Sequence, residues 1–197
     1  MRNVRIFPNR YLFRYKGEKI FSYLCKKCTD MQEFIYKMIG ENGTWCAAGY
    51  RGDEPEVTIP AMYCGQPVTI LFDDLFKGHT EITLVHIPDT VVEIGGFVFD
   101  GCSALRNVAL PSSVENMWQY AFVRSSIEEI VLPEKLTYIA PFVFKDCKKL
   151  RKVVCNGNLK EICAKAFEGC DNLTELINVD HVMVSPRHGA PNLQLNL

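Results

Sequence analysis

The chain has 197 residues, of which 48% are apolar and 23% are charged, and its formal net charge is −1. This composition can bury a sizeable core, which argues against wholesale disorder. No apolar run approaches the roughly 18 residues of a membrane-spanning helix, so no such helix is expected.

The N-terminal residues carry charge but neither an apolar stretch nor a small-residue cleavage site, so no signal peptide is predicted. If Met1 is the native start, the expected location is cytoplasmic; if the chain was trimmed, the cell surface or secretion is the alternative. Residues 1–28 hold eight Lys/Arg and one acidic residue, a net charge of +7, whereas the remainder carries −8. The basic head could bind nucleic acid, an anionic surface or the acidic body of the same chain, and we favour the last interpretation.

Two elements are predicted ahead of the main body of the chain. Residues 11–24 alternate in polarity around Lys16-Gly17-Glu18, which indicates a β-hairpin. Residues 31–39 place apolar side chains at i, i+3, i+4, i+7 and i+8 between a candidate N-cap, Asp30, and a candidate stop, Gly40. We therefore expect residues 1–41 to form a small α+β cap over the open end of a repeat stack. The alternative is a dimerisation or recruitment element.

Cys25-x-x-Cys28 directly precedes this predicted helix. A helix N-terminus lowers the pKa of a thiol, so a redox pair is conceivable, but the βαβ context of such pairs is missing. A zinc site would need two further ligands, and the sequence has no second close cysteine pair. Cys25 and Cys28 are therefore only a weak metal candidate, an inert pair is the preferred interpretation, and no cofactor is predicted.

The main body of the chain, residues 42–179, is a repeat of about 23 residues. Phenylalanines recur at spacings of 23, 23, 22 and 23, at Phe76, Phe99, Phe122, Phe144 and Phe167. Apolar residues recur eight and five positions before each phenylalanine and six and nine positions after it, except in the 22-residue unit, where Ile127 and Ile130 come one position early. One such unit cannot close a core alone, so stacked units must bury these columns against one another. The segments 106–110, 128–132 and 151–155 are predicted strands that pair between turns at about 4.8 Å. A further column, three residues after each phenylalanine, is expected to hold small interior side chains: His79, Cys102, Ser125, Cys147 and Cys170.

These repeats resemble a known family. The unit Leu105-x-x-Val108-x-Leu110-Pro111-x-x-Val114-x-x-Met117-x-x-x-Ala121-Phe122 is similar to the BspA-type (Treponema pallidum-type) leucine-rich repeat, and later units fit the same consensus. The resemblance implies an α/β repeat solenoid, a right-handed β-rich coil of about five repeats. It also implies a bacterial adhesion or interaction module. The repeating proline is missing from the last unit, and residues 180–197 are expected to form a tail with one short strand at 181–184.

Strand alternation predicts which side chains face outward. If Val108 and Leu110 point inward, one outward column is apolar and its neighbour is polar. The apolar column comprises His86 at its start, then Ala109, Val131, Val154 and Ile177; the polar column comprises Asn107, Glu129, Lys152 and Glu175. A contiguous apolar stripe can mark a binding site, although ordinary β-propensity on a half-exposed sheet gives the same pattern.

The predicted function is protein–protein interaction, of adhesion or scaffold type, through this strand face. The face measures only about 400 Å² in projection, against the roughly 800 Å² per partner of a standard interface, so flanking surfaces or self-association should contribute. The partner is an unknown protein, such as a host or cell-surface protein, and a homo-oligomer is a further option. Nucleic-acid or anionic-surface binding through residues 1–28 is the alternative. No nucleophile, acid–base or phosphate-binding motif occurs, so no enzymatic activity is predicted.

Overall fold

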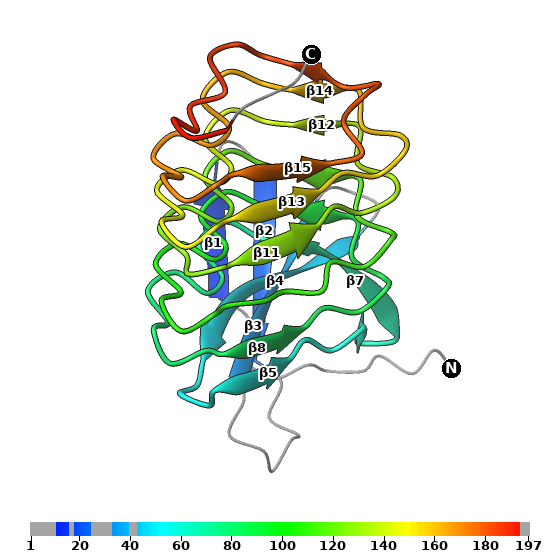
Figure 1. Cartoon of the computed structure of the whole chain (residues 1–197). Coiled ribbons are helices and arrows are strands. Elements are labelled where there is room, and N and C mark those ends of the chain that lie inside the picture. Colours follow the sequence, from blue (N-terminus) through cyan, green and yellow to red (C-terminus); the bar gives the residue numbers. More distant parts are fainter. Residues whose placement is uncertain (1–10, 16–17, 25–32, 40–42, 194–197) are drawn as a thin grey trace, which may run out of the picture.

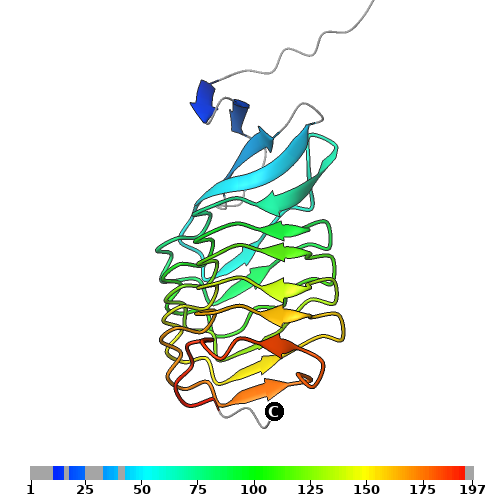
Figure 2. The ribbon, with the colours of Figure 1, turned by 90° about the horizontal axis from the view of Figure 1, so that it is seen from above.

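The computed structural model describes residues 11–15, 18–24, 33–39 and 43–193, with the backbone alone for residues 11–24. These residues form a β-solenoid whose turns stack along one axis, with the N-terminal strands at one end (Figures 1 and 2). None of the described residues forms a helix, and hence none forms a helix long and apolar enough to cross a membrane. The predicted α/β class is therefore wrong, because each 23-residue unit joins its short strands through turns alone.

The strands are short and follow one another in a regular order. They are β1 (Tyr11–Tyr15), β2 (Glu18–Leu24), β3 (Glu33–Ile39), β4 (Thr44–Arg51), β5 (Glu56–Thr58), β6 (Met62–Tyr63), β7 (Gln66–Leu71), β8 (Leu84–His86), β9 (Glu93–Ile94), β10 (Asn116–Met117), β11 (Glu129–Val131), β12 (Tyr138–Ile139), β13 (Lys152–Val154), β14 (Glu161–Ile162), β15 (Glu175–Ile177) and β16 (Met183–Val184).

Two parallel layers of strands run along the solenoid. One layer contains β5 paired with β8, and β11, β13 and β15 in that order. The other contains β7, β9 and β10, then β12, β14 and β16. The predicted strands at 128–132 and 151–155 are confirmed as β11 and β13. The predicted strand at 106–110 is wrong: this segment has no regular strand, and the low β-propensity of Asn107 and Ala109 gives a physical reason.

The predicted phenylalanine column is confirmed as the centre of the core. All five rings are excluded from solvent. Consecutive rings are stacked, with centroids 5.8, 4.8, 5.5 and 5.6 Å apart along the column. Each ring thus contacts the ring of the next turn, and one continuous apolar ladder joins the repeats.

The thiols of the next column are interior hydrogen-bond donors. Cys147 Sγ donates to the carbonyl of Phe122 and Cys170 Sγ to that of Phe144, both at 2.9 Å. Cys102 Sγ makes the equivalent bond to Phe76 O at 3.3 Å. Burial raises the pKa of Cys102 to about 12. Cys102 therefore lacks the lowered pKa of a nucleophilic thiol, and the shared bond to the preceding turn is a structural role for all three cysteines.

A second aromatic ladder lies nearer the surface, two residues before the core phenylalanines. Phe97, Tyr120 and Phe142 stack with centroids 4.9 and 5.1 Å apart and rings within 5° of parallel. All three have positive φ angles between 59° and 65°, a left-handed conformation that is unfavourable for bulky side chains. The ammonium groups of Lys77 and Lys165 lie over the two end rings, 4.9 and 5.5 Å from their centroids.

The N-terminal elements differ from the prediction in one respect. The hairpin is confirmed, since β1 and β2 pair antiparallel. The predicted helix over 31–39 is wrong, because Glu33–Ile39 forms strand β3 between β2 and β4. Phe34 and Tyr36 are buried on alternate positions, so the period is two, and pairing with the neighbouring strands outweighs the helical period.

Strands therefore cover the first turn of the solenoid where a helix was expected. β4 pairs parallel with β7, so the N-terminal sheet continues the layer of β7, β9 and β10. The rings of Phe34 and Tyr50 contact Phe76, with centroids 6.4 and 5.4 Å away. These aromatic side chains close the exposed end of the phenylalanine ladder.

At the other end, the tail continues the path of the repeat. β16 pairs with β14. The backbone N–H of Lys165 donates to Arg187 O, and that of Phe167 donates to His188 O, at 2.6 and 2.8 Å. Leu193, in the last described residues, is buried against the core.

Candidate interaction surface

The layer of β11, β13 and β15 presents two columns of side chains in register. Val131, Val154 and Ile177 are aligned on adjacent strands. Val131 is 64% exposed, Ile177 is 38% exposed and Val154 is half-buried, whereas Ile130 and Val153, the residues before Val131 and Val154, are buried. The outward orientation expected from strand alternation is thus observed for this apolar column.

The second column alternates in charge. Glu129, Lys152 and Glu175 are aligned on the same three strands, one residue from the inward positions. Arg151 forms an ion pair with Glu129, and Arg106 pairs with Glu128 at 2.6 Å. The apolar column therefore lies beside a mixed-charge border, an arrangement in which apolar contact and charge matching can act together.

The remaining candidate residues extend the same face toward the N-terminal end. His86 is on β8, in register with Thr58 of β5, and its Nε2 lies 2.9 Å from Glu56 Oε1. Asn107 and Ala109 are exposed on the segment between β8 and β11. In Figure 1 the strands β5, β8, β11, β13 and β15 lie one above another in a single layer.

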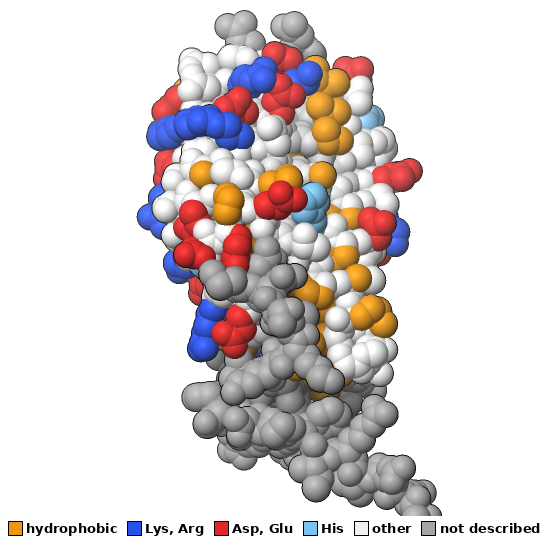
Figure 3. Space-filling model, turned by 90° about the horizontal axis from the view of Figure 1, so that it is seen from below, with side chains coloured by type: hydrophobic (Ala, Val, Ile, Leu, Met, Phe, Trp, Pro, Cys, Tyr) orange, Lys and Arg blue, Asp and Glu red, His pale blue; other side chains and the backbone are white. Residues whose placement is uncertain are grey.

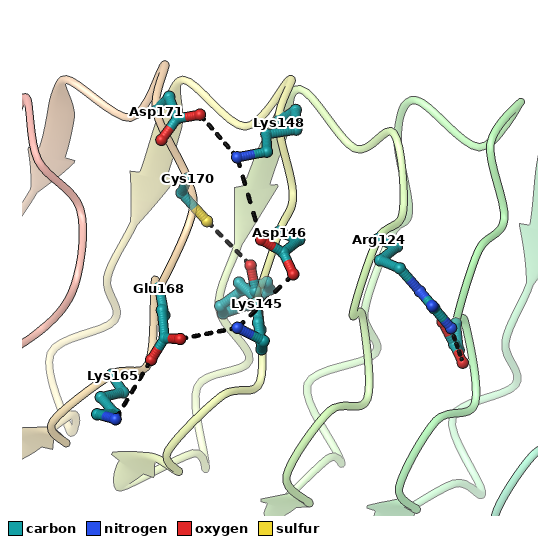
Figure 4. Close-up of polar contacts among 10 residues, drawn as sticks. Arg124, Lys145, Asp146, Lys148, Lys165, Glu168, Cys170 and Asp171 are labelled. Carbon is teal, nitrogen blue, oxygen red and sulfur yellow. Dashed lines mark hydrogen bonds and ion pairs between the residues drawn. The ribbon is translucent and has the colours of Figure 1, made fainter.

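Ion pairs between turns occupy another flank (Figure 4). Arg124 makes three contacts of 2.8 to 3.0 Å with the carboxylate of Asp100, whose side chain is 1% exposed. Lys145 pairs with Glu168 at 2.8 Å, and this pairing lowers the pKa of the Glu168 carboxyl. In the view of Figure 3, charged side chains lie on both sides of a run of hydrophobic side chains. The charges of Figure 4 are largely satisfied within the chain.

Two hollows lie away from the strand face. One, of about 660 Å³, has a polar lining that includes Glu115, Lys135 and His181. The other, of about 740 Å³, has a mixed lining that includes Phe72, Glu93 and the half-exposed Trp118. Neither hollow was predicted from the sequence. The second could have been noticed there, because Gly95-Gly96 stand at repeat positions where the neighbouring units carry side chains.

The chemical alternatives of the sequence lie largely outside the described residues. The structure does not describe Cys25 and Cys28. Of the basic head, residues 1–28, it describes only the backbone of β1 and β2. Within the described part of the chain, no group of three or more His, Cys, Asp or Glu side chains could hold a metal ion. Cys46 is buried, and Cys64 is exposed in the turn between β6 and β7.

The repeat geometry agrees with the sequence family. Residues 69–184 match the model of the BspA-type leucine-rich repeat region in six copies. The chain belongs to the BspA-type leucine-rich repeat family. The sixth copy was not counted in the sequence, because the match continues to residue 184, beyond the five phenylalanine units.

Solved structures of bacterial proteins share the fold. The Treponema pallidum leucine-rich repeat protein is 29% identical with a TM-score of 0.69, over 77% of this chain and 82% of that chain. A leucine-rich repeat protein from Bacteroides capillosus is 27% identical with a TM-score of 0.53, over 62% and 94%. A leucine-rich cell surface protein from Faecalibacterium prausnitzii is 25% identical with a TM-score of 0.51; this chain spans 52% of its length, and 72% of this chain is covered. No curated protein matches the sequence.

Proposed function

We propose that this BspA-type chain is a protein-interaction module, of adhesion or scaffold type, that binds a protein partner through its strand face. The proposed binding residues are His86, Asn107, Ala109, Glu129, Val131, Lys152, Val154, Glu175 and Ile177. The observation that carries the proposal is the outward column of Val131, Val154 and Ile177, in which Val131 and Ile177 are exposed and Val154 is half-buried, held in register by parallel pairing.

The chemistry of the face supports a protein partner. Outward-facing branched side chains on adjacent strands offer apolar area, and the column Glu129–Lys152–Glu175 offers alternating charge for selectivity. A rigid sheet loses little conformational freedom when it binds, which favours affinity. Because the face is about 400 Å² in projection, adjacent segments or a second copy of the chain would enlarge the contact.

The family also supports the proposal. The repeats of this family form a scaffold that exposes a large surface for its length. The Faecalibacterium prausnitzii relative is described as a cell surface protein. We therefore propose a cell-surface location for this chain and a host or cell-surface protein as its partner.

The test is a comparison of immobilised variants in one extract of surface proteins. The double variant Val131→Asp/Val154→Asp should lose the proteins that the wild-type chain retains, because two carboxylates would be desolvated in the contact. The matched control is Ala164→Asp/Met183→Asp, at exposed positions off the strand face. Retention of the same proteins by all three chains would refute the strand face as the site. Sedimentation of each variant separates partner binding from self-association.

A further inference from the structure

The hollow of about 740 Å³ lies on the layer of β7, β9 and β10, away from the strand face. Its floor is the dipeptide Gly95-Gly96, directly after β9. The preceding and following turns carry side chains at the same positions, Phe72-Asp73 and Trp118-Gln119. One turn thus lacks side chains between two turns that carry them, and the hollow is lined by all three turns.

The glycine floor is required by the close approach of the neighbouring turn. A Cβ on Gly95 would lie 2.6 Å from Asp73 Oδ1 and 2.9 Å from Leu71 O. The Gly96 N–H donates to Asp73 Oδ1 at 2.8 Å, which fixes this carboxylate at the rim of the hollow. The preceding turn thus occupies the space that a side chain on Gly95 would need, so only glycine fits there, and the polar rim beside it is ordered.

Two aromatic side chains stand on opposite sides of this floor. Phe72 and Trp118 are two turns apart, about 10 Å by strand spacing. Trp118 is 50% exposed, yet its ring is held in place because Nε1 donates to Glu93 Oε1 at 2.7 Å. An exposed indole that is already oriented can accept a ligand with little loss of side-chain freedom.

The polar groups around the hollow include both acceptors and donors. Asp73 and Glu93 supply carboxylate oxygens, and Gln119 supplies an amide with both functions. The ammonium group of Lys37 lies over the Phe72 ring, 4.7 Å from its centroid. The face of Phe72 already holds a cation, which leaves the indole of Trp118 as the open aromatic surface for a ligand.

We propose that this hollow is a carbohydrate-binding site. The apolar C–H face of a pyranose ring would pack on the exposed indole of Trp118. Its hydroxyl groups would donate to Asp73 and Glu93 and would also accept from Gln119, a pairing that needs the mixed lining observed. The volume falls within the roughly 300–1,000 Å³ range of ligand sites and suits one or two sugar rings of a glycan.

The test begins with an array of oligosaccharides containing neutral hexoses and N-acetylhexosamines, probed with the purified full chain. We expect a subset of these glycans to bind, and the strongest one is then titrated calorimetrically. Trp118→Ala and Gln119→Ala should each lower the affinity for that glycan by at least about tenfold, which corresponds to about 1.4 kcal/mol of binding free energy. Both side chains are exposed, so far-UV circular dichroism should show an unchanged fold.

The control is Val131→Asp/Val154→Asp, which should bind the glycan as the wild type does, because these residues lie on the other layer. Loss of glycan binding in this control alone would assign the sugar to the strand face and overturn the proposal. Absence of any bound glycan on the array would overturn it, as would equal affinity in the Trp118→Ala variant. Binding of lysine-rich peptides that depends on Trp118, without glycan binding, would identify a cation site instead.

Discussion

The two aromatic ladders of the solenoid occupy positions only two residues apart, yet their surroundings differ. The inner rings, such as Phe122, are fully buried and tilted by 14° to 25° relative to their neighbours. The outer rings, such as Tyr120, are part-exposed and within 5° of parallel. The same repeat spacing aligns both columns, but only the inner one removes large apolar areas from water.

The backbone sharpens this difference. Every outer ring is carried on a left-handed residue, which is unfavourable for an aromatic side chain by roughly 1–2 kcal/mol. Stacking returns energy of the same order, from two neighbouring rings at Tyr120 and from one ring and a lysine ammonium at Phe97 and Phe142. The outer ladder is therefore close to neutral for stability, whereas the inner ladder should dominate it.

The largest expected effect follows at the centre of the inner ladder. Phe122→Ala removes a ring that stacks on Phe99 and Phe144, and should lower the free energy of unfolding by about 3–5 kcal/mol. Urea denaturation followed by circular dichroism measures this change. The comparison variant is Tyr120→Ala, for which the loss should be several-fold smaller. Equal losses at the two positions would contradict the distinction between the ladders.

The second largest loss of stability is expected at the ion pair of Asp100 and Arg124. The Asp100 carboxylate is buried and Arg124 is exposed, so the buried charge depends on this one arginine. Arg124→Met should cost about 2 kcal/mol, since it leaves a carboxylate without its charged donor. Arg106→Met is the control, because the Arg106–Glu128 pair is largely exposed and should contribute less than about 1 kcal/mol. The measurement is the urea midpoint of each variant, which should fall further for Arg124→Met than for Arg106→Met. Similar midpoints would show that burial of Asp100 does not strengthen its ion pair.

The inner ladder was predictable from sequence because a constant spacing is visible without knowing any structure. The outward columns followed from strand alternation, which orients side chains whatever the neighbouring turns do. The helix over 31–39 failed because nine residues satisfy both periods. Phe34, Ile35 and Met38 fit a helix, while Phe34, Tyr36 and Met38 fit a strand, and only pairing with β4 decides between them.

The outer ladder and the hollow were harder to predict. The spacings between Phe97, Tyr120 and Phe142 are 23 and 22, so the column was present in the sequence. Its left-handed backbone was not, since aromatic residues rarely adopt this conformation. The hollow depends on the side chains of the two neighbouring turns, at Phe72-Asp73 and Trp118-Gln119. Their position around Gly95-Gly96 is visible only in the stacked structure.

Alkaline pH should weaken the interior next to the inner ladder. Burial raises the pKa of the Cys102 thiol from 9.0 to about 12 in the folded chain. Its contribution to stability is complete below pH 9 and is lost as the pH rises toward 12, because the unfolded chain releases the proton first. From pH 8 to pH 10 the loss should be about 1.4 kcal/mol for this thiol.

The matched variant for this prediction is Cys102→Ser, since serine stands at the same place in the repeat of Ser125. The difference in free energy of unfolding between wild type and variant, measured by urea titration at both pH values, should shift by that amount in favour of the variant. A difference that is constant between pH 8 and pH 10 would show that the thiol keeps its ordinary pKa.

The smallest effect distinguishes backbone strain from ring packing at Tyr120. Tyr120→Gly and Tyr120→Ala both remove the ring and its two stacking contacts, but only glycine adopts φ near 65° without strain. The glycine variant should therefore be more stable than the alanine variant by about 0.5–1 kcal/mol. At Phe122, which is not among the left-handed positions, the order should reverse, because glycine there only adds freedom to the unfolded chain. The four variants, unfolded in urea under one condition, test this reversal; the same order at both positions would mean that the left-handed turn of the outer ladder carries no strain.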